Sequence, residues 1–186
     1  MPDSSLRGKR ILVTHADAFM GPVLCEVLAR RGATVIPSTD ALLEPEAPAA
    51  LVAASGQVDI LVANLAIRNP RTSAIDVDEV EWREVFATLV DPLPRLCRAV
   101  LPAMIARRAG KILVMGSASA LRGIKGATTY SAARGAQLAY VQSLGVEVAA
   151  HNVQVNAIAQ NFVDNPTYFP PEVQADPRFQ DRLKRE

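Results

Sequence analysis

The segment ILVMGSASALRGIKGATTYSAARGAQLAYVQSLGVEVAAHNVQVNAI, residues 112–158, contains the pattern that decides the fold. It opens with the apolar run 112–115 and closes with the largely β-branched stretch 153–158, and both are short enough to be buried strands. Residues 129–149 between them form one long predicted helix. A strand, a helix and a second strand in this order predict a right-handed βαβ unit with two parallel strands.

The same alternation runs through the rest of the chain. Further strands are predicted at 11–14, 34–36 and 58–63, and further helices at 20–31, 49–55, 79–90 and 92–108. Nearly continuous apolar strands separated by helices predict an α/β fold: a Rossmann-like, doubly wound parallel sheet between two layers of helices. We expect residues 1–186 to form a single domain, with its βα units in residues 1–158.

Residues 159–186 break this pattern. They contain four prolines, end in DRLKRE, and show neither a helical nor a strand period. A long segment of this kind beside the carboxyl edge of a sheet is typical of a lid or binding loop. We therefore expect it to close a ligand pocket.

The composition excludes several classes of function. The 186 residues are 49% hydrophobic and carry a formal net charge of +1, so no basic surface for nucleic acid or membranes is expected. The polar N-terminus lacks the apolar core of a signal peptide, which favours a cytoplasmic protein. Cys25 and Cys97 fall at apolar helix positions, and His15 and His151 are isolated, so neither a disulfide nor a metal site is expected.

Three polar residues at the predicted carboxyl edge suggest a catalytic site. Ser117 ends the strand 112–115, Tyr130 opens the next helix, and Arg134 lies one turn further on the same helix face. A guanidinium next to a phenol favours its charged form and stays protonated itself. A tyrosine and an arginine at this spacing are more often a surface pair, and Ser117 raises the odds of a functional site.

The loop after the first strand, THADAFMG at residues 14–21, argues against a nucleotide cofactor. A dinucleotide loop needs three glycines, and this loop keeps only Gly21. His15 and Phe19 occupy the other two glycine positions, and the Phe19 ring would fill space that a pyrophosphate needs. The loop after the third strand, Asn64 to Ala66, lacks a glycine as well. We therefore expect no cofactor.

Together these residues resemble the short-chain dehydrogenase/reductase superfamily and, more closely, the halohydrin dehalogenases within it. That family carries Thr-x4-Phe/Tyr-x-Gly in the first loop and Ser-x12-Tyr-x3-Arg in the catalytic region. The first motif is present as Thr14, Phe19 and Gly21, and the second as Ser117, Tyr130 and Arg134. The segments 60–66, 91–102 and 151–162 look like the B subtype of the family.

The resemblance implies cofactor-independent conversion of vicinal haloalcohols to epoxides. Tyr130, assisted by Arg134, would remove the hydroxyl proton while Ser117 holds the oxygen, and the alkoxide would displace the halide. Small anions would open epoxides in the reverse direction. The resemblance also implies a homotetramer and a halide and substrate pocket from Thr14, Phe19, Gly21, Gln160, Asn161 and Phe162, with Tyr168 and Phe169 as further members.

The chain departs from the family in length. Members run to about 250 residues, a usual domain size, whereas this sequence stops at Glu186, so we expect a C-terminally truncated form. Two alternatives stay open. One is a divergent NAD(P)-dependent oxidoreductase in which Arg134 replaces a lysine, and the other is a catalytically silent paralogue with a structural role.

Overall fold

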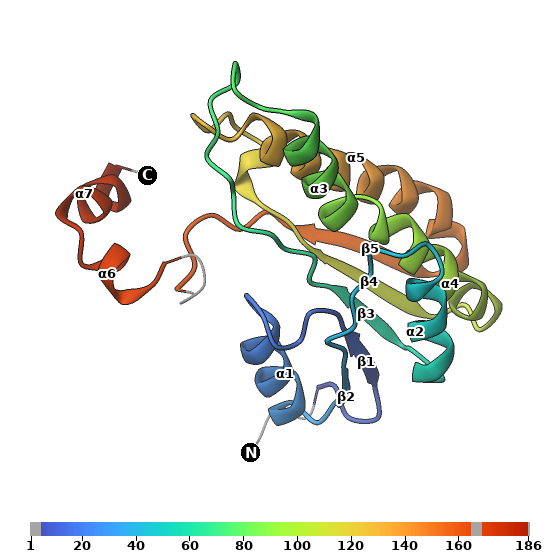
Figure 1. Ribbon diagram of the computed structural model, residues 1–186. Coiled ribbons are helices and arrows are strands. Elements are labelled where there is room, and N and C mark those ends of the chain that lie inside the picture. Colours follow the sequence, from blue (N-terminus) through green and yellow to red (C-terminus); the bar gives the residue numbers. More distant parts are fainter. Residues whose placement is uncertain (1–4, 165–168, 186) are drawn as a thin grey trace.

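A five-stranded parallel sheet forms the centre of the protein, as the computed structural model shows (Figure 1). The structure describes residues 5–164 and 169–185. The strand order is β2-β1-β3-β4-β5. The strands are β1 (Arg10–Val13), β2 (Thr34–Pro37), β3 (Ile60–Ala63), β4 (Gly110–Met115) and β5 (Val153–Ile158). The doubly wound parallel sheet predicted from the sequence is confirmed.

The chain changes direction across the sheet between β1 and β3. It runs outward from β1 to β2, then returns to place β3 on the other side of β1. Ligands of such sheets bind where the loops diverge, beyond the carboxyl ends of the strands at this switch point. The loops that follow β1, β3, β4 and β5 therefore frame the region in which a site is expected.

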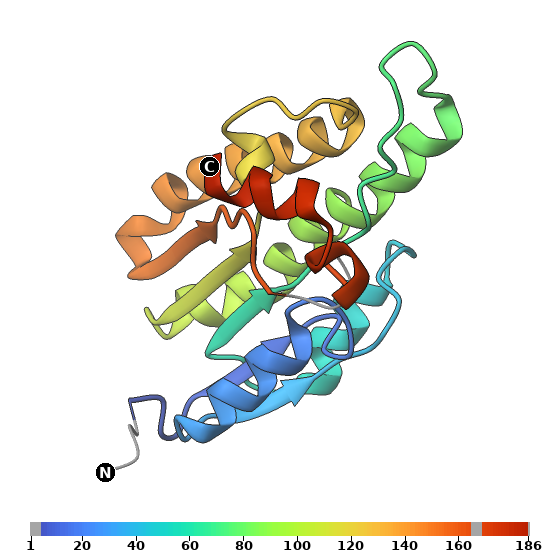
Figure 2. The same ribbon diagram turned by 90° about the vertical axis from the view of Figure 1, so that its left-hand side faces the viewer.

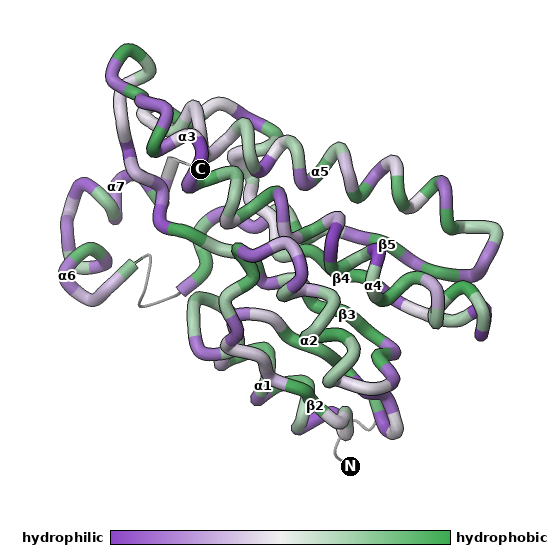
Figure 3. The backbone as a smooth tube through the Cα atoms, turned by 45° about the vertical axis from the view of Figure 1, so that its right-hand side comes forward, coloured by the Kyte–Doolittle hydropathy of each residue, from purple (hydrophilic) through white to green (hydrophobic). Residues whose placement is uncertain are grey.

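Helices cover the two faces of the sheet unequally. The helices of the sheet core are α1 (Gly21–Arg30), α2 (Ala47–Ser55), α3 (Glu79–Leu89), α4 (Pro92–Ala106) and α5 (Thr128–Val148). Helix α1 lies on one face, and the other four gather on the opposite face (Figure 1). The tube view shows the strands as mostly hydrophobic stretches inside this arrangement (Figure 3).

Two hydrophobic cores follow from this arrangement. The larger one joins Leu12, Leu61 and Ile112 to buried side chains of α3, α4 and α5. The smaller one packs Ile11 and Val13, together with other strand residues, against α1. Because side chains alternate across a strand, β1, β2, β3 and β4 supply both cores, whereas β5 supplies only the larger one.

The segment after β5 differs from the prediction. The sequence indicated no regular structure in residues 159–186, but the structure contains two short helices, α6 (Pro171–Gln174) and α7 (Pro177–Arg185). Each begins at a proline, which suits a first helical turn because its missing N–H has no intrahelical partner there. The pair stands beyond the carboxyl ends of the strands, in front of the sheet in Figure 2. Its position still fits the predicted lid.

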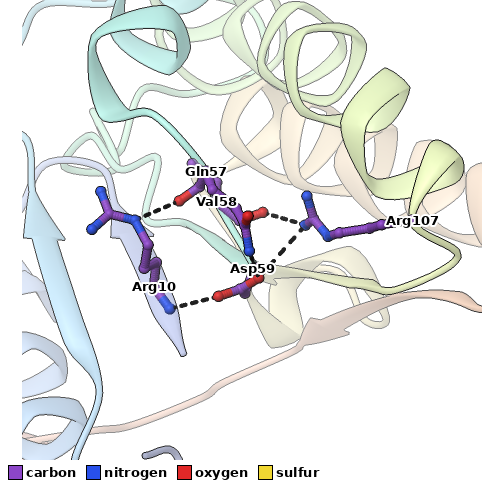
Figure 4. Close-up of polar contacts among 5 residues, drawn as sticks. All are labelled: Arg10, Gln57, Val58, Asp59 and Arg107. Carbon is purple, nitrogen blue, oxygen red and sulfur yellow. Dashed lines mark hydrogen bonds and ion pairs between the residues drawn. The ribbon is translucent and has the colours of Figure 1, made fainter. Parts of the chain in front are cut away.

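At the amino ends of the strands, Asp59 links β1 and β3 to the end of α4 (Figure 4). Its carboxylate accepts hydrogen bonds from the Arg10 backbone N–H at 2.8 Å and from the Gln57 amide at 2.8 Å, and it pairs with Arg107 at 4.0 Å. Burial alone raises the pKa of Asp59, but these hydrogen bonds and the charges of Arg107 and Lys9 outweigh it, so the pKa is lowered. This network joins β1, β3 and the end of α4.

The structure also describes the cysteines, the groups that could bind a metal ion and the hydropathy of the helices. Cys25 and Cys97 are free, and burial raises the pKa of Cys97 to about 12, which keeps that thiol protonated and unreactive. In the described ranges, no three acidic, histidine or cysteine side chains gather as metal ligands would. None of the helices described combines the length and the hydropathy of a membrane span.

Candidate active site

A cavity of about 690 Å³ opens at the carboxyl edge of the sheet. Gly116 and Ser117 from the end of β4, Tyr130 from α5 and Gln160 from the loop after β5 line it. The remaining lining residues are Met20, Arg68, Asn69, Arg71, Ile124, Lys125, Asn161, Phe162, Val163, Phe169, Glu172, Val173, Asp176, Arg178, Phe179 and Arg182. A smaller hollow of about 390 Å³ lies between α4 and α5 and contains none of the predicted catalytic residues.

Ser117 is held by a second serine. Its Oγ accepts hydrogen bonds from the backbone N–H of Ser119 at 3.2 Å and from the Ser119 hydroxyl at 3.0 Å. Ser119 is only 4% exposed and lies in the short 3-10 helix η1 (Ala118–Ala120). Because both bonds are accepted by Ser117, its own hydroxyl proton stays available for a ligand oxygen in the cavity.

Tyr130 and Arg134 lie side by side. Of these two residues, Tyr130 lines the cavity and Arg134 does not. Tyr130 is 8% exposed, and the Arg134 guanidinium carbon lies 5.1 Å from the centre of its ring. This distance and geometry are those of a cation–π contact. The predicted meeting of the two side chains is therefore observed, and the arginine lies inside the protein.

Arg134 is also an anchor between two strand ends. Its Nη1 donates to the carbonyl oxygens of Leu65 at 2.9 Å and Met115 at 3.0 Å, and to Oε1 of Gln137 at 2.9 Å. Gln137 in turn donates to the carbonyl oxygen of Leu89 at 2.6 Å. The side chain of Arg134 thus fixes the carboxyl ends of β3 and β4 against α5.

No carboxylate neutralises this arginine in the described chain. Arg134 is 3% exposed, its hydrogen-bond acceptors are neutral carbonyl oxygens, and no ion pair joins it to an acidic residue within residues 5–164 and 169–185. Its Nε also has no partner there. A buried positive charge with only neutral acceptors favours negative charge forming close to it.

The first loop keeps an unusual backbone shape. His15 has φ of 43° and Phe19 has φ of 55°, values that glycine adopts far more readily. Both lie at the positions where a dinucleotide loop would have glycine. At Gly21 an added Cβ would lie 2.2 Å from the carbonyl oxygen of His15, so only glycine fits. The loop thus has left-handed backbone, with side chains, at the two positions where a dinucleotide loop would have glycine.

Asn64 holds this loop in place. Its side-chain amide donates to the carbonyl oxygens of His15 at 3.0 Å and Ala18 at 3.1 Å, while its backbone N–H donates to Oγ1 of Thr14 at 3.0 Å. Thr14 is fully buried and does not contact the cavity. Thr14 and Gly21 shape the loop, and neither is among the described residues that line the cavity. Phe19 is half-buried and is not among the described residues that line the cavity. Its neighbour Met20 lines the cavity.

The segment after β5 supplies the other predicted pocket residues. The Gln160 carbonyl oxygen accepts a hydrogen bond from the Ala118 N–H at 2.8 Å, which brings this segment beside Ser117. Oδ1 of Asn161 accepts from Arg122 at 2.9 Å. Gln160, Asn161, Phe162 and Phe169 all line the cavity. Tyr168 lies outside the described residues.

An aromatic cluster joins this segment to α7. The ring of Phe162 lies 5.5 Å from those of both Phe169 and Phe179, and Phe169 lies 5.2 Å from Phe179. Rings at such separations stabilise each other beyond their buried area. Phe179 was not predicted as a site residue, because only the folded chain brings it to Phe162. Ser119 and Gln137 were missed as well, although Gln137 lies three residues after Arg134 on the same helix face.

Comparison with known proteins agrees with this arrangement. The family model for short chain dehydrogenase matches residues 44–175. The 3-oxoacyl-[acyl-carrier-protein] reductase FabG of Escherichia coli (strain K12) is 31% identical over 185 positions, which cover 86% of this chain and 75% of the reductase. The 2-keto-3-deoxy-L-fuconate dehydrogenase of Xanthomonas campestris pv. campestris is 32% identical over 187 positions, covering 89% of this chain and 62% of the dehydrogenase.

Solved structures show the same fold. A structure described as a dehalogenation enzyme is similar with a TM-score of 0.87 and 28% identity, covering 96% of this chain and 82% of its own. A 3-oxoacyl-[acyl-carrier protein] reductase from Brucella melitensis with bound NAD has a TM-score of 0.82 at 20% identity, covering 94% of this chain and 77% of its own. The second likeness supports the fold alone. On its matched family model, its sequence relatives and its sheet, this chain belongs to the short-chain dehydrogenase family.

Proposed function

We propose that this protein converts vicinal haloalcohols to epoxides without a cofactor. Tyr130 takes the hydroxyl proton, and the resulting alkoxide attacks the neighbouring carbon from the side opposite the halogen. The carbon–oxygen bond forms as the carbon–halogen bond breaks, so the products are an epoxide, a halide ion and a proton. Small anions open epoxides by the reverse path.

The observation that carries this proposal is the buried, unneutralised charge of Arg134. Its guanidinium lies over the Tyr130 ring, and no described carboxylate pairs with it. A permanent positive charge in a poorly solvated position stabilises a phenolate beside it, which a general base near neutrality requires. Lysine could give up its proton, whereas arginine keeps its charge throughout the reaction.

Ser117 complements the base. Ser119 occupies two acceptor positions of the Ser117 hydroxyl, which leaves the Ser117 proton to bind the substrate oxygen. Placing this oxygen between Ser117 and Tyr130 fixes the line along which the halide leaves. We assign the halide to the part of the cavity lined by Gln160, Asn161 and Phe162. Aromatic ring edges carry partial positive charge and suit such an anion.

A reductase is the second candidate, favoured by two observations. The curated relatives include several 3-oxoacyl-[acyl-carrier-protein] reductases, and the first loop has left-handed backbone at the two positions where a dinucleotide loop would have glycine. Against it stand the side chains of His15 and Phe19, since backbone must approach a pyrophosphate closely at those positions. The residues present therefore fit a dinucleotide poorly.

Chloride release decides between the candidates. The protein is incubated with 1-chloro-2-propanol without any nucleotide, and chloride and propylene oxide are measured together. Tyr130→Phe should abolish turnover, while Tyr140→Phe, on the same helix and beside the smaller hollow, serves as the matched control. No chloride from the unmodified protein would contradict the proposal. A parallel titration with NADPH and NADH followed by Trp82 fluorescence tests the reductase, which requires saturable binding.

A further inference from the structure

The charges that line the cavity are strongly unbalanced. Five cationic side chains and two acidic ones line it, an excess of three positive charges, although the whole chain carries only +1. The cationic residues are Arg68, Arg71, Lys125, Arg178 and Arg182, and the acidic ones are Glu172 and Asp176. Fields of one sign in a concave site raise the local concentration of oppositely charged ligands.

Three of the cationic residues lie on loops of the sheet, and neither of the two acidic lining residues lies on those loops. Both acids belong to the segment of α6 and α7, whereas Arg68 and Arg71 follow β3 and Lys125 precedes α5. In the described part of the chain, the side chains of Arg68, Arg71 and Lys125 make neither a hydrogen bond nor an ion pair. Their charges are therefore open to a ligand.

The two loops that carry these cations lie against each other. Arg71 has φ of 63° and Gly126 has φ of 69°. A Cβ added at Gly126 would lie 3.4 Å from the Arg71 carbonyl oxygen, so the backbones meet at this point. Lys125 precedes Gly126 directly, so the backbones of Arg71 and Lys125 lie close together in the lining of the cavity that Ser117 and Tyr130 also line.

We infer that the substrate is a haloalcohol that carries a carboxylate, an inference that rests on the proposed dehalogenation. The carboxylate binds at the wall formed by Arg68, Arg71 and Lys125, and the hydroxyl binds between Ser117 and Tyr130. With 4-chloro-3-hydroxybutanoate, the C3 oxygen loses its proton to Tyr130 and attacks C4, and the C4–Cl bond breaks. The products are 3,4-epoxybutanoate, chloride and a proton, with no change in oxidation state.

A matched pair of substrates tests this inference. We compare kcat/KM for 4-chloro-3-hydroxybutanoate with that for its neutral amide, which has nearly the same shape. The acid should be preferred about two- to tenfold, because exposed ion pairs are individually weak. The preference should fall towards one as sodium sulfate is raised to about 0.5 M, since salt screens exposed charges. The double variant Arg71→Gln, Lys125→Gln should lose most of it, while Arg30→Gln, Arg83→Gln, which also removes two positive charges but at exposed positions on α1 and α3, should keep it.

A binding measurement keeps this inference separate from the proposed function. Calorimetric titration compares 3-hydroxybutanoate with 3-hydroxybutanamide, neither of which can release halide. Tighter binding of the acid, reduced in the double variant, supports the carboxylate wall. Equal binding and equal turnover of acid and amide would overturn the inference and leave dehalogenation standing. Absence of chloride from both substrates would refute the proposed function, and the titration would then decide alone whether the wall binds carboxylates.

Discussion

Asn64 offers the sharpest test of how the first loop is held. It is 1% exposed, and its amide donates two hydrogen bonds to loop carbonyl oxygens at 3.0 and 3.1 Å. Each such bond contributes about 0.5–1.5 kcal/mol net, so Asn64→Ala should lower the free energy of unfolding by about 1–3 kcal/mol. In a domain of this size, each kcal/mol corresponds to about 2–4 °C, so the melting temperature should fall by roughly 2–12 °C.

Urea unfolding followed by circular dichroism measures this loss, and the slope of the transition should stay constant because the buried area hardly changes. Asn156→Ala is the matched control, since Asn156 is exposed on β5 and such changes stay within about 0.5 kcal/mol. Equal stability of the two variants would refute the reasoning, because the Asn64 amide would then contribute nothing to the loop.

Three further predictions concern the site and the sheet edges. Ser119→Ala should lower kcat about three- to tenfold by removing one hydrogen bond to Ser117, the proposed substrate-binding serine, while the exposed Ser143→Ala should not, in a chloride-release assay. Gly21→Ala should cost about 3 kcal/mol or more in urea unfolding, because its Cβ would lie 2.2 Å from a backbone oxygen, whereas Gly123→Ala meets nothing within 4 Å. The pKa of Asp59 is lowered below its ordinary 3.8, so its carboxylate stabilises the fold above that pH and this stabilisation is lost as the pH falls through the lowered value. Asp59→Asn should remove this part of the acid dependence, and an unchanged dependence in acid titrations of unfolding would contradict the role of the network.

Much of the fold was predictable because local patterns agree with the tertiary arrangement. The apolar runs at 112–115 and 153–158 are the strands β4 and β5, within two residues. The sequence predicts separate helices at 79–90 and 92–108, and the structure ends α3 at Leu89 and begins α4 at Pro92. The predicted convergence of Ser117 and Tyr130 is observed as well, because parallel strands bring their carboxyl ends to one edge.

The unpredicted parts depend on contacts between residues far apart in the sequence. Residues 171–185 were predicted to be irregular, and they form α6 and α7 next to an aromatic cluster that Phe179 joins from α7. Thr14 and Gly21 were assigned to the pocket from a motif, and only the folded loop shows that neither is among the described residues lining the cavity. Asn64 closes that loop across about fifty residues, a distance that no local pattern spans.

By itself, the sequence determined the parallel sheet and the placement of Ser117, Tyr130 and Arg134 at its carboxyl edge, because hydrophobic periodicity fixes the order of strands and helices. Only the tertiary structure decided that Arg134 is buried without a described carboxylate while Tyr130 lines the cavity. It also brought Arg68, Arg71 and Lys125 into the lining of one cavity. Burial and the charge around a group depend on the whole surroundings of a side chain, and these exist only after distant segments have packed together.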